Sequence, residues 1–289
     1  MMTKVPVAVI GSVNIDITIY TRLRPAAGET VLGWQFNHFI GGKGFNQALA
    51  AGPLVPTTLL SAVGGTEHSD IVEALTDKEV ETQDLKVLEE TTGHAFITVT
   101  PDGENSIVVV PGANEHLKPS DIRPSLDITQ PDVVLTQREI PAETVAAARR
   151  WAEENSARYA LNASPVAGIT AEDVATCDPL IVNIHEAQHL VEHDPRETTP
   201  VQMLTEGLQR LTRSAVLTAG EQGAWAIQAN SITYVPPEPV THVVDTTGAG
   251  DTFAGVLCAH LALGDSLIEA AREASRAAAE VVAVPRAER

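Results

Sequence analysis

The sequence has 289 residues, a formal net charge of −19 from 19 basic and 38 acidic side chains, and 44% hydrophobic residues. This length suits one large α/β domain or two ordinary ones with a sizeable core, and the acidic balance argues against a nucleic-acid or anionic-membrane binder. The longest apolar run, at 253–263, is too short to span a bilayer, and no signal peptide is evident. Cys177 and Cys258 match no metal spacing, so we expect reduced thiols and a cytoplasmic protein.

The N-terminal third is predicted to be rich in strands. Residues 7–10 form an apolar run, and Ile15, Ile17 and Ile19 alternate with polar residues, the period of a half-buried strand. Helices are predicted at 44–52 and 70–80, further strands at 57–65 and 85–88, and a hairpin over 93–114 that turns at PDGEN. Segments 13–42 and 92–110 are therefore expected to form a small β layer on a body of 1–12, 43–91 and 111–289.

The remaining chain alternates between helix and strand, which is typical of a mostly parallel sheet with helices on both faces. Strands are predicted at 132–137, 158–164, 179–184, 214–220 and 223–228, and helices at 141–155, 170–177, 201–212 and 266–283. Near the C-terminal end, VVDTTGAGD (243–251) predicts a strand, a glycine turn and a helix start. Helix N-termini attract anions, and Asp251 directly behind them suggests a general base. An ordinary helix start with a favourable acidic residue is the alternative.

Other polar residues stand where ligands bind in α/β proteins. Asn14 and Asp16 project from one face of a strand, where they suit a polyol, although a solvated surface strand fits equally. Lys43 lies in GGKGF before a helix, without the spacing of a phosphate-binding Walker loop; an ordinary turn with an exposed lysine is the other interpretation. Phe253 occupies the third glycine position of a dinucleotide fingerprint, which argues against a dehydrogenase.

Three segments after predicted strands offer further candidates, each with a simpler alternative. Asn183 and Glu186 could hold water around Mg²⁺ and phosphate, or simply cap a helix. Thr218 precedes a glycine-containing turn at 220–223 that suits a ligand passing over bare backbone, or only a strand–turn–strand. Glu139 follows a strand at the edge where ligand sites lie, although a lone glutamate there is usually solvated.

Together, GSVNID, PAAGETV, GGKGFNQA, GENSIVVVPGAN and DTTGAGDTFAG resemble the signature segments of the PfkB carbohydrate kinase family, and within it the ribokinases. The resemblance runs from about residue 5 to 283. It implies a three-layer α/β/α sandwich with a mostly parallel central sheet and a small β-sheet lid. It also implies ATP-dependent phosphorylation of D-ribose at the 5-hydroxyl, giving ribose 5-phosphate. A homodimer formed through the lid is expected for a separate reason, because an open sheet with an apolar face needs a cover, and the lid segments carry Ile17, Ile19, Trp34, Phe36, Phe39 and Val109.

The resemblance also implies residue roles. Asp251 would be the general base, and the N–H groups of Gly248, Ala249 and Gly250 would form an anion hole for the transferring phosphoryl group. The sugar would be held by Asn14, Asp16, Gly42, Lys43, Asn46, Glu139 and Asp251. The nucleotide would be lined by Asn183, Thr218, Ala219, Gly220, Glu221, Gln222, Gly223, Gly250 and Ser275. Glu186 would hold Mg²⁺ through water, and Asp245 and Thr247 would begin a K⁺ site.

The sequence departs from the family pattern near its C-terminal end. The segment VPRAER stands where a glycine-containing loop is expected to complete the K⁺ site. Arg286 is expected there, either supplying the positive charge of the cation or leaving the site half-built. Alternative functions are a nucleoside or pseudouridine kinase of the same family, or a non-catalytic regulator that binds a sugar or nucleotide.

Overall fold

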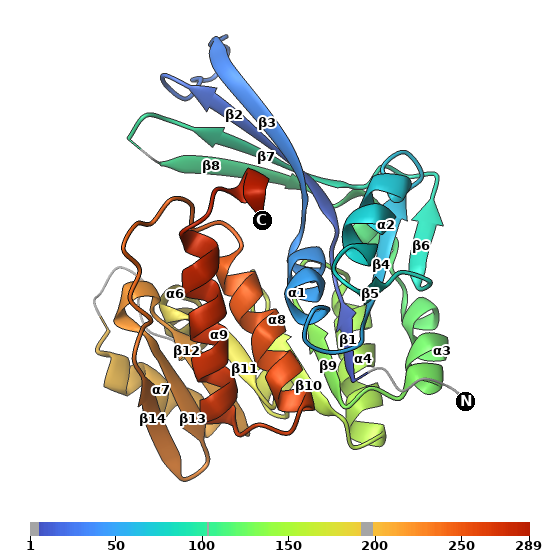
Figure 1. The fold of residues 1–289 in the computed structure, drawn as a ribbon, viewed down its shortest axis with the longest axis vertical. Coiled ribbons are helices and arrows are strands. Elements are labelled where there is room, and N and C mark those ends of the chain that lie inside the picture. Colours follow the sequence, from blue (N-terminus) through green and yellow to red (C-terminus); the bar gives the residue numbers. More distant parts are fainter. Residues whose placement is uncertain (1–5, 103, 192–198) are drawn as a thin grey trace.

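A large, mostly parallel sheet forms the centre of the molecule in the computed structural model, which describes residues 6–102, 104–191 and 199–289 (Figure 1). Its strand order is β14-β13-β12-β11-β10-β9-β1-β4-β5, with β6 also paired to β4. Only β13 and β14 run antiparallel to their neighbours in this sheet. The strands are β1 (Val7–Ile10), β4 (Thr57–Gly64), β5 (Val80–Glu81), β6 (Leu85–Leu88), β9 (Val133–Thr136), β10 (Arg158–Asn162), β11 (Leu180–Asn183), β12 (Ser214–Thr218), β13 (Ala224–Gln228) and β14 (Ser231–Val235).

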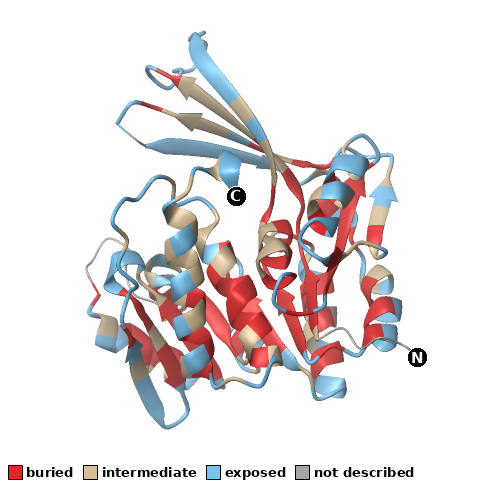
Figure 2. Ribbon diagram, viewed as in Figure 1, coloured by how far each residue is buried: buried red, intermediate tan, exposed pale blue. Residues whose placement is uncertain are grey.

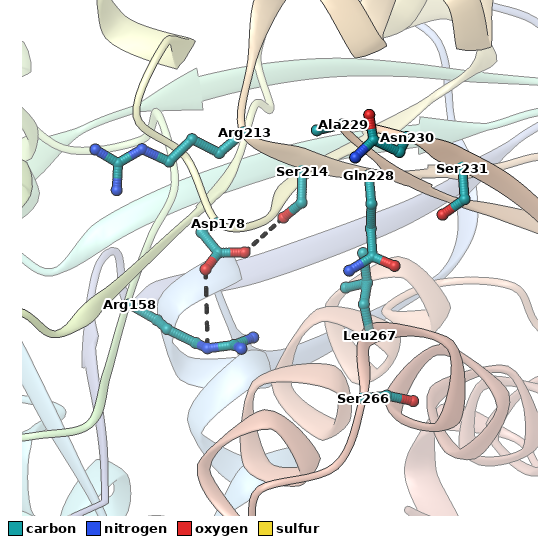
Figure 3. A pocket seen from close by; sticks show the side chains of 10 residues that line it. All are labelled: Arg158, Asp178, Arg213, Ser214, Gln228, Ala229, Asn230, Ser231, Ser266 and Leu267. Carbon is teal, nitrogen blue, oxygen red and sulfur yellow. Dashed lines mark hydrogen bonds and ion pairs between the residues drawn. The ribbon is translucent and has the colours of Figure 1, made fainter.

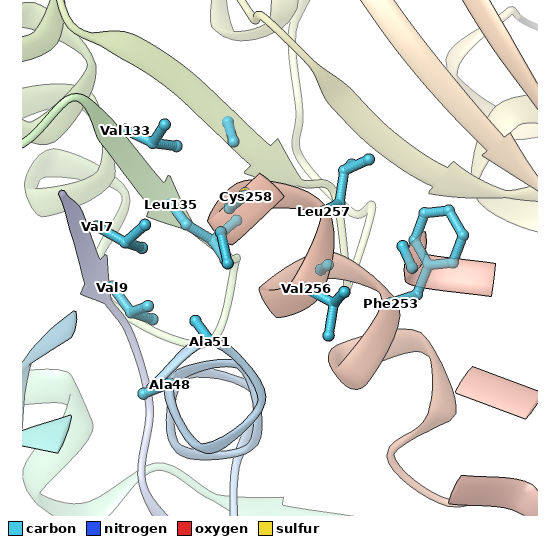
Figure 4. Packing of buried hydrophobic residues seen from close by; sticks show 14 of the residues in the cluster. Val7, Val9, Ala48, Ala51, Val133, Leu135, Phe253, Val256, Leu257 and Cys258 are labelled. Atoms are coloured by element: carbon cyan, nitrogen blue, oxygen red, sulfur yellow. The ribbon is translucent and has the colours of Figure 1, made fainter. Parts of the chain in front are cut away.

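Helices cover both faces of this sheet. Because side chains alternate along a strand, Val9 and Leu135 pack into one apolar cluster (Figure 4), and Ile10 and Val134 pack into the other. The first face carries α1 (Lys43–Ala51), α2 (His68–Thr76), α8 (Ala249–Ala262) and α9 (Leu267–Val282). The second carries α3 (Pro119–Thr129), α4 (Ala142–Glu154), α5 (Ala171–Val174), α6 (Ile184–Leu190) and α7 (Val201–Leu211). The predicted α/β/α sandwich is confirmed, with the buried residues concentrated along the sheet (Figure 2).

A second, smaller sheet stands to one side of this body (Figure 1). Its order is β3-β2-β7-β8, formed by β2 (Asn14–Thr21), β3 (Gly33–Gly41), β7 (Gly93–Val99) and β8 (Asn105–Val110). The hairpin β7–β8 is present as predicted, while Gly103 of its turn lies outside the described residues. All four strands fall within 13–42 and 92–110, and the division of the chain at those boundaries stays a prediction.

The sequence prediction fails in several places. No strand precedes the glycine turn: residues 236–248 form neither helix nor strand, and the Val244 N–H donates instead to the Val282 carbonyl at 2.8 Å. The helix predicted over 70–80 ends at Thr76, and Val80–Glu81 forms β5. Helix α3, strand β14 and the short 3-10 helix η1 (Gly112–His116) had not been predicted.

Helix α8 is the element that positions the functional residues described below. It is apolar around most of its circumference and lies between α1 and α9. At Gly255 a Cβ atom would come within 2.3 Å of the Gln47 carbonyl oxygen, so glycine is what allows α8 to approach α1 this closely. Cys177 and Cys258 are buried and unpaired, as expected. Among the described residues, we find no helix with both the length and the apolar character needed to cross a membrane.

Candidate active site

The predicted site residues gather where the parallel strands end. Glu139 follows β9, Asn183 ends β11, and Thr218 ends β12. Asn162, which the sequence analysis did not single out, ends β10 between them. Asn183 and Thr218 are direct partners in the β11–β12 register. Because parallel strands point their carboxyl ends the same way, these residues lie at the end of the sheet where open α/β proteins bind ligands.

The N-terminus of α8 opens at this edge. Gly248 precedes the helix with φ of 78°, a left-handed conformation that glycine adopts without steric cost. A Cβ atom built on Gly250 would meet no heavy atom within 4 Å apart from its chain neighbours and the backbone of its own helix, so the space beside this residue is open. The Ala249 N–H donates to the Thr246 carbonyl at 3.2 Å. Helix N-termini of this kind present N–H groups and a positive dipole to an anion.

Asp251 lies in the first turn of α8 and is 9% exposed. Asn46 Nδ2 donates to its Oδ2 at 3.0 Å, and Gln47 Nε2 donates to its Oδ1 at 3.2 Å. Burial raises the pKa of the Asp251 carboxyl, while the positive charge of Lys43 and the hydrogen bond from Asn46 act against that rise. A carboxylate held in a fixed orientation with a raised pKa suits a general base.

An amide network that the sequence analysis missed lies behind Asp251. Gln47 Nε2 also contacts Asn162 Oδ1 at 3.1 Å, and Gln137 Nε2 donates to Gln47 Oε1 at 2.6 Å. These residues come from α1, the end of β10 and the segment after β9. No short motif joins them, so only the folded chain brings them together. Because the network fixes Gln47, it also fixes the orientation of Asp251.

Lys43 is the cation at the centre of the site. Burial disfavours its charged form, yet the negative charges of Asp251, Glu139, Glu186 and Asp16 raise the pKa of Lys43 overall. The structure therefore brings four predicted carboxylates into the electrostatic environment of one predicted lysine. Gly42, with φ of 92°, is the N-cap of α1 directly before Lys43.

Glu139 is anchored from two other elements. Its Oε2 accepts hydrogen bonds from the Ser12 hydroxyl at 2.6 Å and from the Lys43 N–H at 3.2 Å. Ser12 was not singled out in the sequence, because a serine after a strand carries no specific signal. The contacts tie the end of β1, the start of α1 and the end of β9 together.

Asn14 and Asp16 lie on the face of the small sheet that meets these groups. Asn114 Nδ2 donates to Asn14 Oδ1 at 2.8 Å, so this side chain is fixed by a residue that the sequence analysis did not single out. Arg286 Nη2 donates to Asp16 Oδ2 at 2.7 Å. Burial raises the pKa of the Asp16 carboxyl, and the charge and hydrogen bond of Arg286 oppose that rise.

The placement of Arg286 corrects the expectation that it lies at the K⁺ site. Arg289, not Arg286, contacts the segment predicted to begin that site: its guanidinium donates to the backbone carbonyls of Asp245, Thr247 and Val284. Asp245 Oδ1 accepts a hydrogen bond from the Thr247 N–H at 2.8 Å. The physical reason is the turn after α9, which directs Arg286 toward the small sheet and Arg289 toward the loop before α8.

On the predicted nucleotide side, Asn183 and Glu186 form a reciprocal helix cap. The Glu186 N–H donates to Asn183 Oδ1 at 2.9 Å, and the Asn183 N–H donates to Glu186 Oε2 at 2.8 Å, which is the capping-box arrangement. Thr218 leads into the 3-10 helix η2 (Gly220–Gln222). The segment 218–223 thus lies beside Asn183 at the sheet edge, whereas Ser275 lies on α9.

A cavity of about 520 Å³ lies at the amino ends of the central strands, away from the site around Asp251 (Figure 3). Its lining includes Arg158 at the start of β10 and Ser214 at the start of β12. Ser214 donates to Asp178 at 2.6 Å within it. Because the cavity is at the amino ends of the strands, it is separate from the site around Asp251.

Comparisons with known proteins agree with this geometry. Residues 4–288 match the family model described as pfkB family carbohydrate kinase. The chain is 34% identical over 275 residues to a ribokinase of Bacillus subtilis, covering 94% of this chain and 91% of the relative. It is 32% identical over 275 residues to a deoxyribokinase of Salmonella typhi, covering 92% and 88%. The solved structure of Arabidopsis thaliana ribokinase complexed with ribose and ATP superposes with a TM-score of 0.86 at 30% identity, covering 98% and 94%.

Proposed function

Because the chain belongs to the pfkB family of carbohydrate kinases, an ATP-dependent family, we propose that its substrate is D-ribose and its product ribose 5-phosphate. The observation that carries the proposal is the buried Asp251 carboxylate in the first turn of α8, oriented by Asn46 and Gln47 and facing the charge of Lys43. In this proposal Asp251 accepts the proton of the 5-hydroxyl as that oxygen attacks the γ-phosphorus of ATP.

The N-terminus of α8 would stabilise the transferring phosphoryl group. The N–H groups of Gly248, Ala249 and Gly250 are proposed to face its oxygens, as helix N-termini do with anions. In this proposal the Ala249 N–H exchanges its hydrogen bond to the Thr246 carbonyl for one to the phosphoryl group. The open space beside Gly250 fits such a group, since no other part of the described chain comes within 4 Å of a Cβ built there. Phosphoryl transfer depends mainly on positioning and charge stabilisation, and a helix terminus with an adjacent base supplies both.

The sugar would lie between the small sheet and the body. We propose that Asn14, Asp16, Gly42, Lys43, Asn46 and Glu139 hold it. Asn14 and Asp16 belong to the sheet, while Lys43, Asn46 and Glu139 belong to the body. A substrate held by both parts would be correctly placed only when they are together. For this reason we interpret the small sheet, over 13–42 and 92–110, as a lid.

The nucleotide would lie along Asn183, Ser275 and the segment 218–223. Glu186 is proposed to hold Mg²⁺ through water. The described residues include no cluster of three or more acidic, histidine or cysteine side chains suited to a metal, and this fits Mg²⁺, which keeps several waters and binds chiefly through substrate phosphates. When bound, Mg²⁺ would neutralise phosphate charge.

The residues present do not fit a K⁺ ion. The carbonyls of Asp245 and Thr247 already accept hydrogen bonds from Arg289, whose guanidinium remains protonated and carries a positive charge. We therefore expect initial rates in K⁺, Na⁺ and a large organic cation to agree within about twofold, while Arg289→Gln should acquire dependence on K⁺. Activation of the unmodified protein by K⁺ of about tenfold or more, roughly 1.4 kcal/mol, would contradict this expectation.

The assembly and location are also proposals. An exposed apolar face on the lid sheet supports a homodimer formed through the lid, and a test of it is given in the Discussion. Unpaired Cys177 and Cys258 suit the cytoplasm, where thiols remain reduced. We propose small-molecule partners only, sugar and ATP, and neither nucleic acid nor membrane.

An ADP-release assay across pentoses, 2-deoxyribose and nucleosides tests the proposal. Ribose should give the highest kcat/KM, with phosphate on its 5-oxygen by NMR of the product. A higher kcat/KM for a nucleoside or pseudouridine would favour that alternative. ADP release no faster than ATP hydrolysis without any sugar would favour a non-catalytic regulator.

A further inference from the structure

The last turn of the chain lies between the small sheet and the body (Figure 1). This turn, the 3-10 helix η3 (Arg286–Glu288) with Arg289 after it, follows α9. Its two arginines, three positions apart, contact different parts of the proposed active site. Neither contact was expected from the sequence.

Arg286 contacts both strands of the β2–β3 pair. Its Nη2 donates to Asp16 Oδ2 at 2.7 Å and to the Ile40 carbonyl at 3.3 Å. Its guanidinium lies over the ring of Phe39, 5.1 Å from the centroid, and Phe39 is the direct register partner of Asp16. The Arg286 and Asp16 side chains are only 15% and 12% exposed, so solvent and salt screen this ion pair less than a surface pair.

Gly41 makes room for this ion pair. A Cβ atom at Gly41 would lie 2.2 Å from Asp16 Oδ2 and 2.7 Å from Arg286 Nη2, far closer than nonbonded atoms approach. The first glycine of GGKGF therefore does more than shape the turn before α1. It leaves the space in which a guanidinium from the end of the chain meets the lid carboxylate.

Arg289 contacts the loop on the other side. Its guanidinium donates to the carbonyls of Asp245 and Thr247 and lies 4.0 Å from the Asp245 carboxylate. Gly248 and the first turn of α8 come directly after this loop. Fixing residues 245–247 thus fixes the backbone that leads into the proposed phosphoryl site.

We propose that residues 286–289 form a strap that joins the lid to the loop before α8, with Arg286 and Arg289 as positioning residues. Arg286 holds Asp16 in place, and Arg289 holds Asp245–Gly248. Because the strap is one short turn, displacement of the lid at Asp16 is transmitted to the loop. The proposed roles of Asp16 and Gly248–Gly250 rest on the proposed function, whereas the mechanical link does not.

Hydrogen exchange followed by mass spectrometry tests the link without any substrate. In Arg286→Gln, backbone amide exchange should quicken about fivefold or more in β2–β3 near Ile40, because opening of a local contact raises exchange. It should quicken as much in the loop at 243–248, which Arg286 does not touch and which lies on the other side of the strap. Arg289→Gln should likewise quicken exchange in both segments, with β2–β3 now the distant one. The matched control is Arg276→Gln on α9, whose arginine pairs with Glu273 and is 61% exposed. If each substitution quickened exchange only in the segment that its own arginine contacts, the proposal of a strap would be wrong.

Kinetics test the positioning roles. Arg286→Gln should raise KM for the sugar about tenfold or more while KM for ATP changes less than about twofold, and Arg289→Gln should chiefly lower kcat. The lysine variants should recover part of each loss, because lysine keeps the charge and lacks the fork of donors. In the double variant the losses should be less than multiplicative. Two results would overturn the proposal: equal effects of Arg286→Gln on KM for the sugar and KM for ATP, or losses of activity that simply multiply in the double variant.

The two failures are distinguishable. If the unmodified protein phosphorylates no sugar, the proposed function fails, and the exchange experiment still decides whether the strap exists. If the protein is an active kinase but exchange in the two segments is uncoupled, the strap alone fails. Thermal unfolding of every variant confirms that the comparison is made between folded proteins, and the lysine variants serve if a glutamine variant does not fold.

Discussion

At Asp251, burial and hydrogen bonding act in opposite directions on one carboxyl group. Burial raises its pKa, while Lys43 and the amides of Asn46 and Gln47 favour the ionised form. A catalytic base works best when its pKa approaches the working pH without exceeding it. If Asp251 is the proposed base, the balance between desolvation and a nearby cation sets how readily its carboxylate accepts a proton.

The balance predicts the pH dependence of the reaction. Asp251 must be ionised to accept a proton, so kcat/KM should fall on the acidic side with an apparent pKa above the ordinary aspartate value of about 3.9. Lys43→Met removes a charge that lowers the pKa of Asp251, so the acidic limb should move to higher pH. Lys43→Arg is the control that keeps the charge. An acidic limb at the same pH in Lys43→Met would contradict this account.

The sequence identifies some of these residues and misses others for a physical reason. Asp251 could be predicted because the glycines and the helix start are its neighbours in the chain. Gln47, Gln137 and Asn162 could not, because they come from separate elements and form a network only after folding. Arg286 was assigned to the wrong contact, since the direction of a turn depends on what packs around it.

Among the elements, α8 carries the two glycines with the clearest and most different roles. Gly255 is in the middle of the helix, where a Cβ would come within 2.3 Å of the Gln47 carbonyl oxygen of α1. Gly250 is in the first turn, where a Cβ would meet nothing. Gly255 is needed for packing, whereas the space beside Gly250 is open, and we propose that a phosphoryl group lies there.

This contrast predicts opposite effects of two alanine substitutions. Gly250→Ala should leave thermal stability unchanged or raise it by up to about 1 kcal/mol, because alanine favours a helix, yet it should lower kcat/KM for ATP. Gly255→Ala should destabilise the fold by roughly 1–3 kcal/mol through overpacking. Differential scanning calorimetry measures the change in stability, and steady-state kinetics measures kcat/KM for ATP. Full activity of Gly250→Ala would show that no phosphate approaches this turn.

Element prediction succeeded where side-chain periodicity reports burial directly. The alternation of Ile15, Ile17 and Ile19 gave β2, and the uninterrupted run 7–10 gave β1. It failed at 243–247, where valines suggested a strand. There the N–H groups of Val244 and Asp245 donate to the Val282 carbonyl at the end of α9. The backbone of this β-branched stretch therefore hydrogen-bonds to a helix terminus and not to a neighbouring strand.

At the scale of the whole molecule, the lid sheet has one face toward the site and another exposed. Asp16 and Phe39 share the inner face. The alternation of side chains places Ile19 opposite Phe36, and Phe96 opposite Val108, on the outer face. Phe36 is 67% exposed and Val108 is 64% exposed. Contiguous apolar surface of this kind indicates a covering partner, which we propose to be a second copy of the chain.

Light scattering tests this assembly. The unmodified protein should have twice the chain mass of 30.6 kDa at micromolar concentration, and Phe36→Asp combined with Val108→Asp should give a folded monomer, because a desolvated unpaired charge opposes association. Leu263→Asp is the control, since Leu263 is also a well-exposed apolar residue and lies at the far end of α8. A monomeric unmodified protein, or a doubly substituted protein that stays dimeric, would contradict a dimer through the lid.

The whole arrangement has one central claim, which is that body and lid bring a sugar hydroxyl to the Asp251 carboxylate at the N-terminus of α8. Single-turnover transfer of the labelled γ-phosphoryl group from ATP to ribose, compared between the unmodified protein and Asp251→Asn, tests it most directly. We predict that transfer slows by roughly 10²–10⁴, the usual contribution of a general base, while ribose binding measured by calorimetry changes little. Transfer by Asp251→Asn within about threefold of the unmodified rate, far short of that contribution, would contradict the account.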